Sequence, residues 1–254
     1  MLTPVLHRID SSEALKSLIR RRFKALGVTI HRYPGPVGGD PFEDMHRLVL
    51  TGRRPLIIDV GANVGQSVVQ FKAMFPSAEM HSFEPSPSTY DLLCSNAARY
   101  SGVHLNNCGV GAEAAEAMLL ENSYSDMSSL LTPDRLAWGE VTQQTPVRIE
   151  TLDDYCADHN LEPITIVKTD TQGSDLDVVK GSVGLIARHR IQMVYMEVII
   201  SEMYEGLPHF DEVLLFMREH GFRLVSLYNF RIQEGLLSWA DALFVDPAFE
   251  AAEE

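Results

Sequence analysis

Short apolar runs alternate with amphipathic segments along the chain from residue 55 onward. The runs are typical of strands buried on both faces, and apolar residues at helical spacing between them indicate helices. Strands are predicted at 56–60, 78–83, 103–108, 164–169, 191–198, 222–227 and 241–246. Helices are predicted at 65–75, 86–99, 151–159, 174–187 and 209–220. This alternation predicts an α/β fold with a doubly wound, mostly parallel seven-stranded sheet covered by helices on both faces.

The last two predicted strands are joined by a loop and not by a helix. A connection of that kind predicts an antiparallel last strand. Residues 121–146 form a polar, irregular insertion. Because surface loops often carry functional residues, this insertion is expected to contribute substrate contacts.

The first 54 residues are interpreted as an N-terminal helical extension with a loop, followed by one domain over residues 55–250. A capped helix is predicted over residues 11–25, and the segment 33–41, rich in Pro and Gly, is predicted to be a loop. That loop either covers the active site or only connects the extension to the domain. The second interpretation is favoured.

Composition and charge disfavour several classes of function. The 254 residues are 45% hydrophobic and 22% charged, as in ordinary globular domains, and no apolar run is long enough for a membrane helix. The net charge of -14 disfavours a nucleic-acid surface, and the basic run Arg20–Arg22 is interpreted as one solvated helix face. Three widely spaced cysteines and an N-terminus without a secretory stretch favour a cytoplasmic protein without disulfides.

The segment Leu56–Gln66, with the sequence LIIDVGANVGQ, predicts a strand, a tight turn and the start of a helix. Gly61 permits a positive φ or a close backbone approach, and Asn63 tolerates the left-handed region. Asp59 would repel a phosphate but not a ligand that carries an amine and ribose hydroxyls. The pattern G-x-G-x-x-G is missing, which counts against a nicotinamide cofactor, and a purely structural turn is the alternative.

An acidic residue follows the second predicted strand at the same edge of the sheet. Glu84 lies 25 positions after Asp59 and is placed to accept hydrogen bonds from two ribose hydroxyls. Pro85 ends the strand and allows a helix to begin near Ser86. A solvated loop acid is the alternative for Glu84 alone, but its register with Asp59 favours ligand binding.

Five motifs occur in the order and spacing of the FkbM family: IIDVGANVG (57–65), FEPS (83–86), TLDD (151–154), KTDTQG (168–173) and DALFV (241–245). Over residues 55–246 the chain resembles these S-adenosylmethionine-dependent O-methyltransferases, which have the class I methyltransferase, Rossmann-like fold. The resemblance implies that Asp59 and the 61–65 backbone border the methionine end of S-adenosylmethionine. It also implies that Glu84 binds the ribose and that the end of the third strand borders the adenine. The predicted cofactor-binding residues are Asp59, Gly61, Ala62, Asn63, Val64, Gly65, Glu84, Pro85, Ser86, Asn107 and Cys108.

Candidate catalytic residues follow or lie within the fourth and fifth predicted strands. Asp170 ends the fourth strand at the cleft, and Glu197 lies among apolar residues of the fifth. Two carboxylates close together would raise one pKa and supply a general base, whereas Glu197 alone could instead accept bonds from Lys168 or a loop. The two acids could also hold Mg²⁺, a less favoured option, and the sequence shows no metal-ligand cluster of fixed spacing. His209 is a third base candidate, although a lone loop histidine is more often merely exposed.

The motif after the fourth strand departs from the family pattern. Members commonly carry Lys-x-Asp-x-Glu-Gly-x-Glu, whereas this chain has Gln172 and Asp175 at the two glutamate positions. The change puts in doubt any role that needs a negative charge at position 172. Lys168 is retained and is predicted to pair with a carboxylate.

The favoured function is O-methylation of a hydroxyl on a sugar, glycan or sugar-bearing metabolite, and the acceptor class rests on the resemblance. A nicotinamide-dependent oxidoreductase and a catalytically silent cofactor-binding partner protein are the alternatives. The expected partner is a small-molecule or glycan acceptor, with no nucleic acid and no membrane. Whether the chain forms homo-oligomers is left open.

Overall fold

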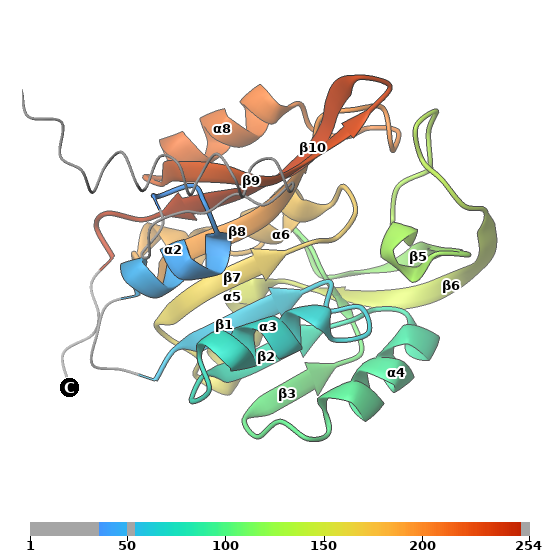
Figure 1. Ribbon diagram of the computed structural model, residues 1–254. Helices are drawn as coiled ribbons and strands as arrows, with labels where there is room; N and C mark the ends of the chain where they lie inside the picture. The colour runs from blue at the N-terminus through green and yellow to red at the C-terminus, as the bar shows by residue number, and fades with distance from the viewer. Residues whose placement is uncertain (1–35, 50–53, 250–254) are drawn as a thin grey trace, which may run out of the picture.

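The computed structural model describes residues 36–49 and 54–249. Seven strands form one sheet in the order β3-β2-β1-β7-β8-β10-β9 (Figure 1). Neighbouring pairs from β3 to β8 are parallel, and β10 is antiparallel to both β8 and β9. This confirms the predicted sheet and its antiparallel last strand. The strands are β1 (Leu56–Val60), β2 (Glu79–Phe83), β3 (Val103–Asn106), β7 (Ile164–Thr169), β8 (Ile191–Ile199), β9 (Arg223–Gln233) and β10 (Leu236–Val245).

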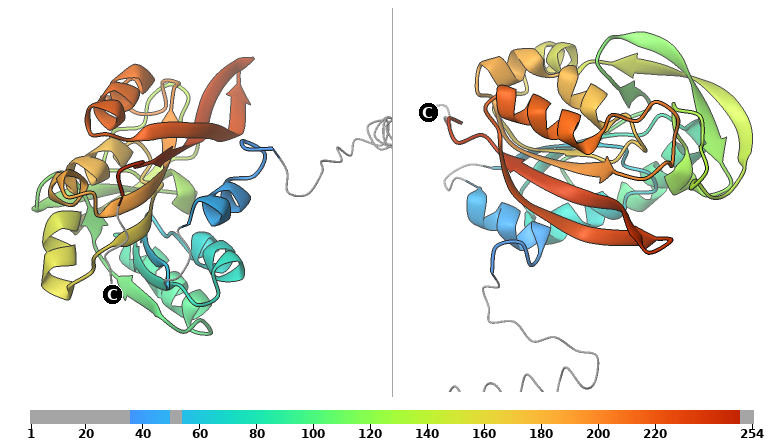
Figure 2. Two further views of the ribbon diagram at one scale, coloured as in Figure 1. Left: turned by 90° about the vertical axis from the view of Figure 1, so that its left-hand side faces the viewer. Right: turned by 90° about the horizontal axis from the view of Figure 1, so that it is seen from above.

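Each face of the sheet packs against its own hydrophobic core. Successive β1 residues alternate between the two, with Ile57 in one core and Ile58 and Val60 in the other. The left view of Figure 2 shows the two helical layers on either side of the sheet. One layer holds α2 (Pro41–Leu48), α3 (Gln66–Met74) and α4 (Pro87–Ala97), and the other holds α5 (Leu152–His159), α6 (Asp175–Lys180), α7 (Val183–Ala187) and α8 (Phe210–Glu219).

The helix predicted over residues 174–187 is divided into α6 and α7 near Gly181. A Cβ at this position would lie 2.0 Å from the carbonyl oxygen of Gly111. The two backbones therefore approach more closely than any other residue type would allow, and the helix ends at this contact.

The prediction of an irregular insertion over residues 121–146 agrees with residues 123–140, apart from one short helix, but is wrong at both ends, because residues 121–122 and 141–146 belong to strands. A second sheet in the order β4-β6-β5 is built from β4 (Gly109–Val110), β5 (Ala115–Asn122) and β6 (Val141–Glu150). In Figure 1, β5 and β6 form a curved arm that extends from the main sheet, with the short helix η1 (Ser125–Met127) between them. The β6 strand begins with mostly exposed polar residues, so the sequence there shows no apolar run that would indicate a strand.

The capped helix predicted over residues 11–25 lies outside the described residues. Within the predicted extension the structure shows α2, which begins after the N-cap residue Asp40 and packs Met45 into one core. Asp44 of this helix accepts hydrogen bonds from the Tyr228 hydroxyl (2.8 Å) and the Gly38 amide (2.7 Å). The described part of the 33–41 segment therefore lies beside α2 and β9.

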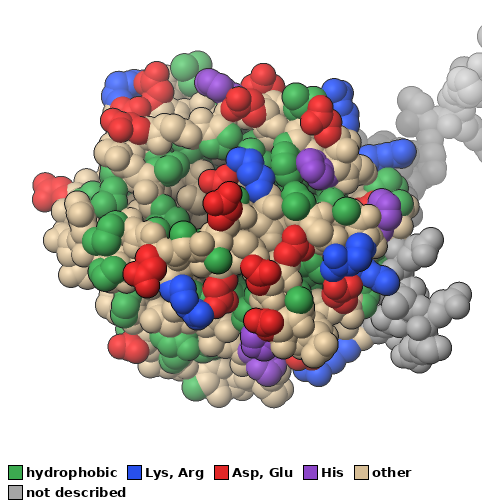
Figure 3. All heavy atoms as spheres, turned by 180° about the vertical axis from the view of Figure 1, so that it is seen from behind, with side chains coloured by type: hydrophobic (Ala, Val, Ile, Leu, Met, Phe, Trp, Pro, Cys, Tyr) green, Lys and Arg blue, Asp and Glu red, His purple; other side chains and the backbone are tan. Residues whose placement is uncertain are grey.

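The surface is mixed in charge. Figure 3 shows acidic side chains spread over one face of the molecule, interleaved with lysines and arginines. Within residues 36–49 and 54–249, no helix combines the length and apolar character needed to cross a membrane.

Candidate active site

A cavity of about 260 Å³ opens at the carboxyl ends of β1, β2, β7 and β8. Ligands of doubly wound sheets bind at this edge. The arm formed by β5, β6 and η1 supplies the opposite wall. The residues that line the cavity include Val60, Gly61, Asn63, Phe83, Glu84, Pro85, Gly109, Val110, Leu119, Ser125, Met127, Leu130, Trp138, Ile149, Asp170, Gln172, Glu197, Arg231 and Trp239.

The turn between β1 and α3 has the predicted conformation. Gly61 has φ +74°, and a Cβ there would lie 1.9 Å from the carbonyl oxygen of Asp170. Asn63 has φ +47° and lines the cavity. The amides of Gly61 and Ala62 donate to the carbonyl of Phe83, at 3.1 and 2.9 Å, which fixes the turn against β2. Of the other predicted residues, Ala62 and Gly65 are buried and Val64 is half-buried, all three away from the cavity lining.

Glu84 is a buried wall of the cavity directly after β2. Its carboxylate accepts hydrogen bonds from the backbone amides of Asn63 and Ser86, both at 2.9 Å. Burial raises the pKa of Glu84 to about 7, against the opposing effect of these two amides. Pro85 lines the cavity beside it, and Ser86 caps α4. The structure thus places Glu84 where it was predicted, with its orientation fixed by the backbone.

Asp59 lies below the cavity floor. Its side chain is fully buried and accepts hydrogen bonds from the hydroxyls of Ser67 (2.6 Å) and Ser82 (3.2 Å). The Lys168 ammonium lies 3.3 Å from Oδ1 of Asp59 as an ion pair and donates to the carbonyl of Gly61 at 2.8 Å. This confirms the predicted pairing of Lys168 with a carboxylate. The geometry places Asp59 as a support for Lys168 and the turn, outside the residues that line the cavity.

The apolar end of the cavity uses different residues from those predicted after the third strand. Asn107 is exposed and donates from its side chain to the carbonyls of Glu84 and Pro85, while Cys108 is buried and burial raises its thiol pKa to about 12. The chain continues into β4, and the next two residues reach the cavity. The apolar wall consists of Phe83, Val110, Leu119, Leu130 and Ile149. Leu119, Leu130 and Ile149 were not predicted from the sequence because they reach the cavity only through the fold of the β5–β6 arm.

The opposite end of the cavity holds the two predicted carboxylates. The side-chain amide of Gln172 donates to both Asp170 and Glu197, each at 3.0 Å. The Tyr204 hydroxyl donates to Oε1 of Gln172 at 2.9 Å. Gln172 has φ +54°, and its carbonyl accepts from the hydroxyl of Ser129 in the arm at 2.6 Å. The neutral amide of Gln172 therefore joins the two acids. An ionised glutamate at position 172 would repel both of them.

The two acids differ in environment. The side chain of Asp170 is 45% exposed and lies 3.8 Å from the Lys168 ammonium. Burial, together with the charges of Asp170, Asp175 and Asp241, raises the pKa of Glu197 well above its ordinary value. Its surroundings therefore disfavour the ionised form of Glu197, and Asp170 is the acid that faces solvent with a cation beside it.

His209 is not brought to these acids. It is exposed at the N-terminus of α8, where its backbone amide donates to Glu212, and it lies outside the cavity lining. The arm instead contributes Ser125, whose hydroxyl donates to the Asn63 side chain at 3.0 Å. Trp138 and Trp239 line the same end, with ring centroids 5.6 Å apart. A pair of tryptophans from distant segments has no signal in a single sequence.

The residues present fit S-adenosylmethionine. The cavity offers three kinds of wall. The turn at Gly61, which has no room for a Cβ, suits the methionine end, the buried carboxylate of Glu84 suits the ribose, and the apolar wall suits the adenine. The turn has glycines at positions 61 and 65 but asparagine at position 63, so it lacks the dinucleotide motif G-x-G-x-x-G. The geometry therefore suits a single nucleoside better than a dinucleotide.

Comparison with known proteins identifies the family. Residues 59–224 match the family described as the methyltransferase FkbM domain. The chain is 27% identical over 189 residues to the 2-O-methyltransferase NoeI of Sinorhizobium fredii, covering 65% of this chain and 75% of that protein. It is also 27% identical over 142 residues to Methyltransferase 1 of Beauveria bassiana, covering 49% of this chain and 57% of that protein. The chain thus spans little more than half of the length of Methyltransferase 1.

Among solved structures, TrmK of M. capricolum in complex with S-adenosylhomocysteine aligns with a TM-score of 0.48 and 7% identity, covering 86% of this chain and 73% of that one. The strand order described above is that of the class I methyltransferase fold. The family match excludes the alternative of a nicotinamide-dependent oxidoreductase. The chain therefore belongs to the FkbM family of S-adenosylmethionine-dependent methyltransferases.

Proposed function

We propose that this protein transfers the methyl group of S-adenosylmethionine to a hydroxyl of a sugar, glycan or sugar-bearing metabolite. The observation that carries the proposal is the pair Asp170 and Glu197, joined by Gln172 at the end of the cavity away from its apolar wall. A hydroxyl must lose its proton as it attacks, and a positioned carboxylate can accept that proton. The name of the relative NoeI, a 2-O-methyltransferase, supports transfer to oxygen.

The cofactor supplies an electrophilic methyl group, and the protein supplies binding and orientation. Glu84 is proposed to accept hydrogen bonds from the ribose hydroxyls, beside the apolar wall that would hold the adenine. The turn at Gly61 is proposed to border the methionine end. Asp59 acts as a positioning residue because its buried carboxylate holds Lys168, which in turn holds the Gly61 carbonyl.

Asp170 is proposed as the general base. It is exposed to an acceptor and paired with a cation, whereas Glu197 is buried and its surroundings disfavour the ionised form that a base requires. The Gln172 amide fixes the Asp170 carboxylate through Oδ1 and leaves Oδ2 toward Lys168. His209 has no part in this proposal because it lies outside the cavity lining.

A sugar acceptor is supported by the walls next to these acids. Trp138 and Trp239 offer indole faces, which pack against the C–H faces of sugar rings, and Arg231 offers donors for hydroxyls. The arm that carries Trp138 also contacts the turn through Ser125. Acceptor and cofactor would thus lie in the same cavity.

The test is release of S-adenosylhomocysteine on incubation with a panel of sugars, sugar nucleotides and glycans, with methylated products identified by mass spectrometry. Turnover with a hydroxyl-bearing sugar is expected, together with a raised KM in Trp239→Ala. Methylation confined to acceptors without a sugar would contradict the acceptor class. Cofactor binding without turnover on any acceptor would favour a catalytically silent partner protein instead.

A further inference from the structure

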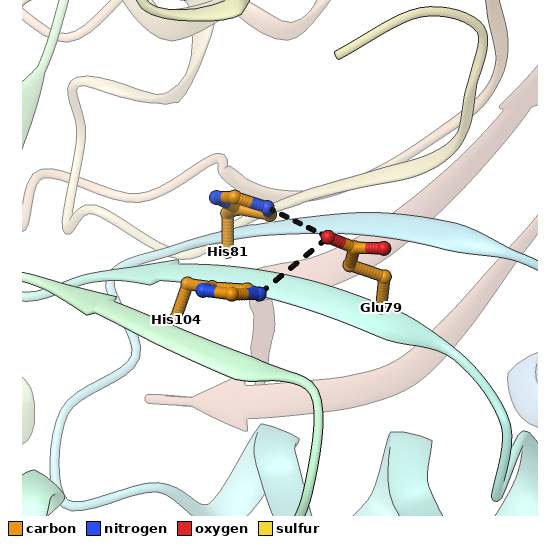
Figure 4. A group of neighbouring side chains, drawn as sticks. All are labelled: Glu79, His81 and His104. Carbon is orange, nitrogen blue, oxygen red and sulfur yellow. Dashed lines mark ion pairs between the residues drawn. The ribbon is translucent and has the colours of Figure 1, made fainter. Parts of the chain in front are cut away.

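Three side chains converge at the amino end of β2, at the opposite end of this strand from Glu84. Glu79 and His81 lie two residues apart and therefore point to the same face of the sheet. His104 on the edge strand β3 is the register partner of His81. Figure 4 shows both imidazoles directed toward the Glu79 carboxylate. The parallel pairing of two strands thus assembles a cluster that is scattered in the sequence.

The distances within this cluster suit a metal ion. One carboxylate oxygen of Glu79 lies 3.7 Å from Nε2 of His81 and 3.5 Å from Nε2 of His104. All three ligand atoms lie within 4.8 Å of one another. Ligands about 2.0–2.1 Å from a tetrahedral zinc ion are separated by roughly 3.4 Å. The cluster is therefore close to the size of a zinc site before any side chain moves.

The hydrogen bonds of His81 leave Nε2 free as a ligand. The Tyr155 hydroxyl donates to Oδ1 of Asn106 at 3.1 Å, so its oxygen accepts the proton on Nδ1 of His81 at 2.8 Å. Nε2 then carries a lone pair that faces a carboxylate oxygen, which is also an acceptor. His81 is 4% exposed, and its Nε2 has no hydrogen-bond partner within the described parts of the chain. Two acceptors that face each other at this distance are stabilised by a cation between them.

The surroundings hold the cluster in place. Arg54 pairs with the other carboxylate oxygen of Glu79 at 3.2 Å, which directs the first oxygen toward the histidines. The two imidazole rings stack with centroids 4.5 Å apart. A bond from a histidine ligand to a second group is typical of metal sites, and Tyr155 supplies it here.

We propose that Glu79, His81 and His104 bind one divalent transition-metal ion of the zinc class, with water completing the coordination. Two imidazoles and a carboxylate are the ligand types that Zn²⁺ accepts. The site would join the edge strand β3 to β2. It lies apart from the cavity, so its loss is expected to leave methyl transfer unchanged and to affect stability.

The test is titration of untagged, chelator-treated protein with ZnCl₂ by calorimetry at pH 7.5, with the visible spectrum of Co²⁺ as an independent signature. One Zn²⁺ per chain is expected, and saturation should raise Tm by about 5 °C. His104→Ala changes a half-exposed side chain and should weaken binding about 100-fold or more, as should Glu79→Gln. Both variants are expected to keep the far-UV spectrum of the parent protein.

The matched control is His189→Ala. His189 is also a half-exposed histidine paired with a carboxylate, at 2.8 Å from Asp246, but it belongs to no group of three ligands among the residues described. This variant should bind Zn²⁺ like the parent protein. Absence of binding in the parent, or equal binding in the parent and in both His104→Ala and Glu79→Gln, would overturn the proposal.

Discussion

The two ends of the cavity hold their carboxylates in different ways. At the cofactor end, Glu84 is oriented by two backbone amides and Asp59 by two serine hydroxyls and a lysine. At the acceptor end, Asp170 and Glu197 share one neutral side chain, Gln172. The first arrangement is built into the strands and the turn. The second depends on a side chain whose backbone is bound by the β5–β6 arm, so the two ends should respond separately to mutation.

The largest expected effect is at the acceptor end. Asp170→Asn keeps the size of the side chain but removes the proton acceptor, and kcat should fall about 10²–10⁴-fold. The Kd for S-adenosylhomocysteine should stay within about twofold, since the amide does not touch the proposed ribose site. Steady-state kinetics and calorimetry on the same preparation check this. Normal turnover would remove Asp170 as the base.

Asp59→Ala should act through stability. The substitution leaves the buried Lys168 ammonium without its nearest carboxylate, and the free energy of unfolding should fall by about 3 kcal/mol. Denaturant unfolding measures the change. Glu84→Gln is the control at the same end, and its loss of stability should be smaller, because the cost of ionising a carboxylate with a raised pKa is removed while one of the two backbone amides loses its acceptor. An equal loss of unfolding free energy in both variants would contradict the view that Asp59 supports the turn while Glu84 contacts the cofactor.

Glu84→Gln should act through cofactor affinity. The loss of charged hydrogen bonds to the ribose should raise the Kd for S-adenosylhomocysteine about 10- to 100-fold. Calorimetric titration checks this, with Asp170→Asn as the control that leaves affinity intact. Unchanged affinity in Glu84→Gln would show that Glu84 does not bind the ribose.

Cofactor affinity should also depend on pH. Only the ionised Glu84 accepts from both hydroxyls, and its pKa in the folded protein is raised to about 7. The fraction ionised therefore rises as pH rises through 7, and affinity should increase about tenfold between pH 6 and 8. Glu84→Gln should flatten this profile. A profile that falls with pH, or one that persists in the variant, would assign the dependence to another group.

The sequence predicts the features that depend on local chemistry. The β1 turn and Glu84 were found because glycines, an asparagine and a strand-ending proline leave a pattern within a few positions. The parallel sheet was found because its strands are apolar on both faces. Asp59 was placed at the correct strand end, but only burial shows that its carboxylate points beneath the turn.

The features that were missed depend on contacts between distant segments. The β6 strand of the arm begins with exposed polar residues, and the apolar residues of β5 and β6 reach the cavity only through pairing over residues 115–150. The amide bridge of Gln172 needs the positions of both Asp170 and Glu197. The cluster of Glu79, His81 and His104 needs the register between β2 and β3, which a single sequence does not supply.

The most direct test is a crystal structure of the protein with S-adenosylhomocysteine. The account predicts both ribose hydroxyls within hydrogen-bond distance of the Glu84 carboxylate, the adenine against Phe83 and Val110, and the sulfur between the Gly61 turn and Asp170. A nucleoside bound with its ribose away from Glu84, or its sulfur remote from Asp170, would contradict it.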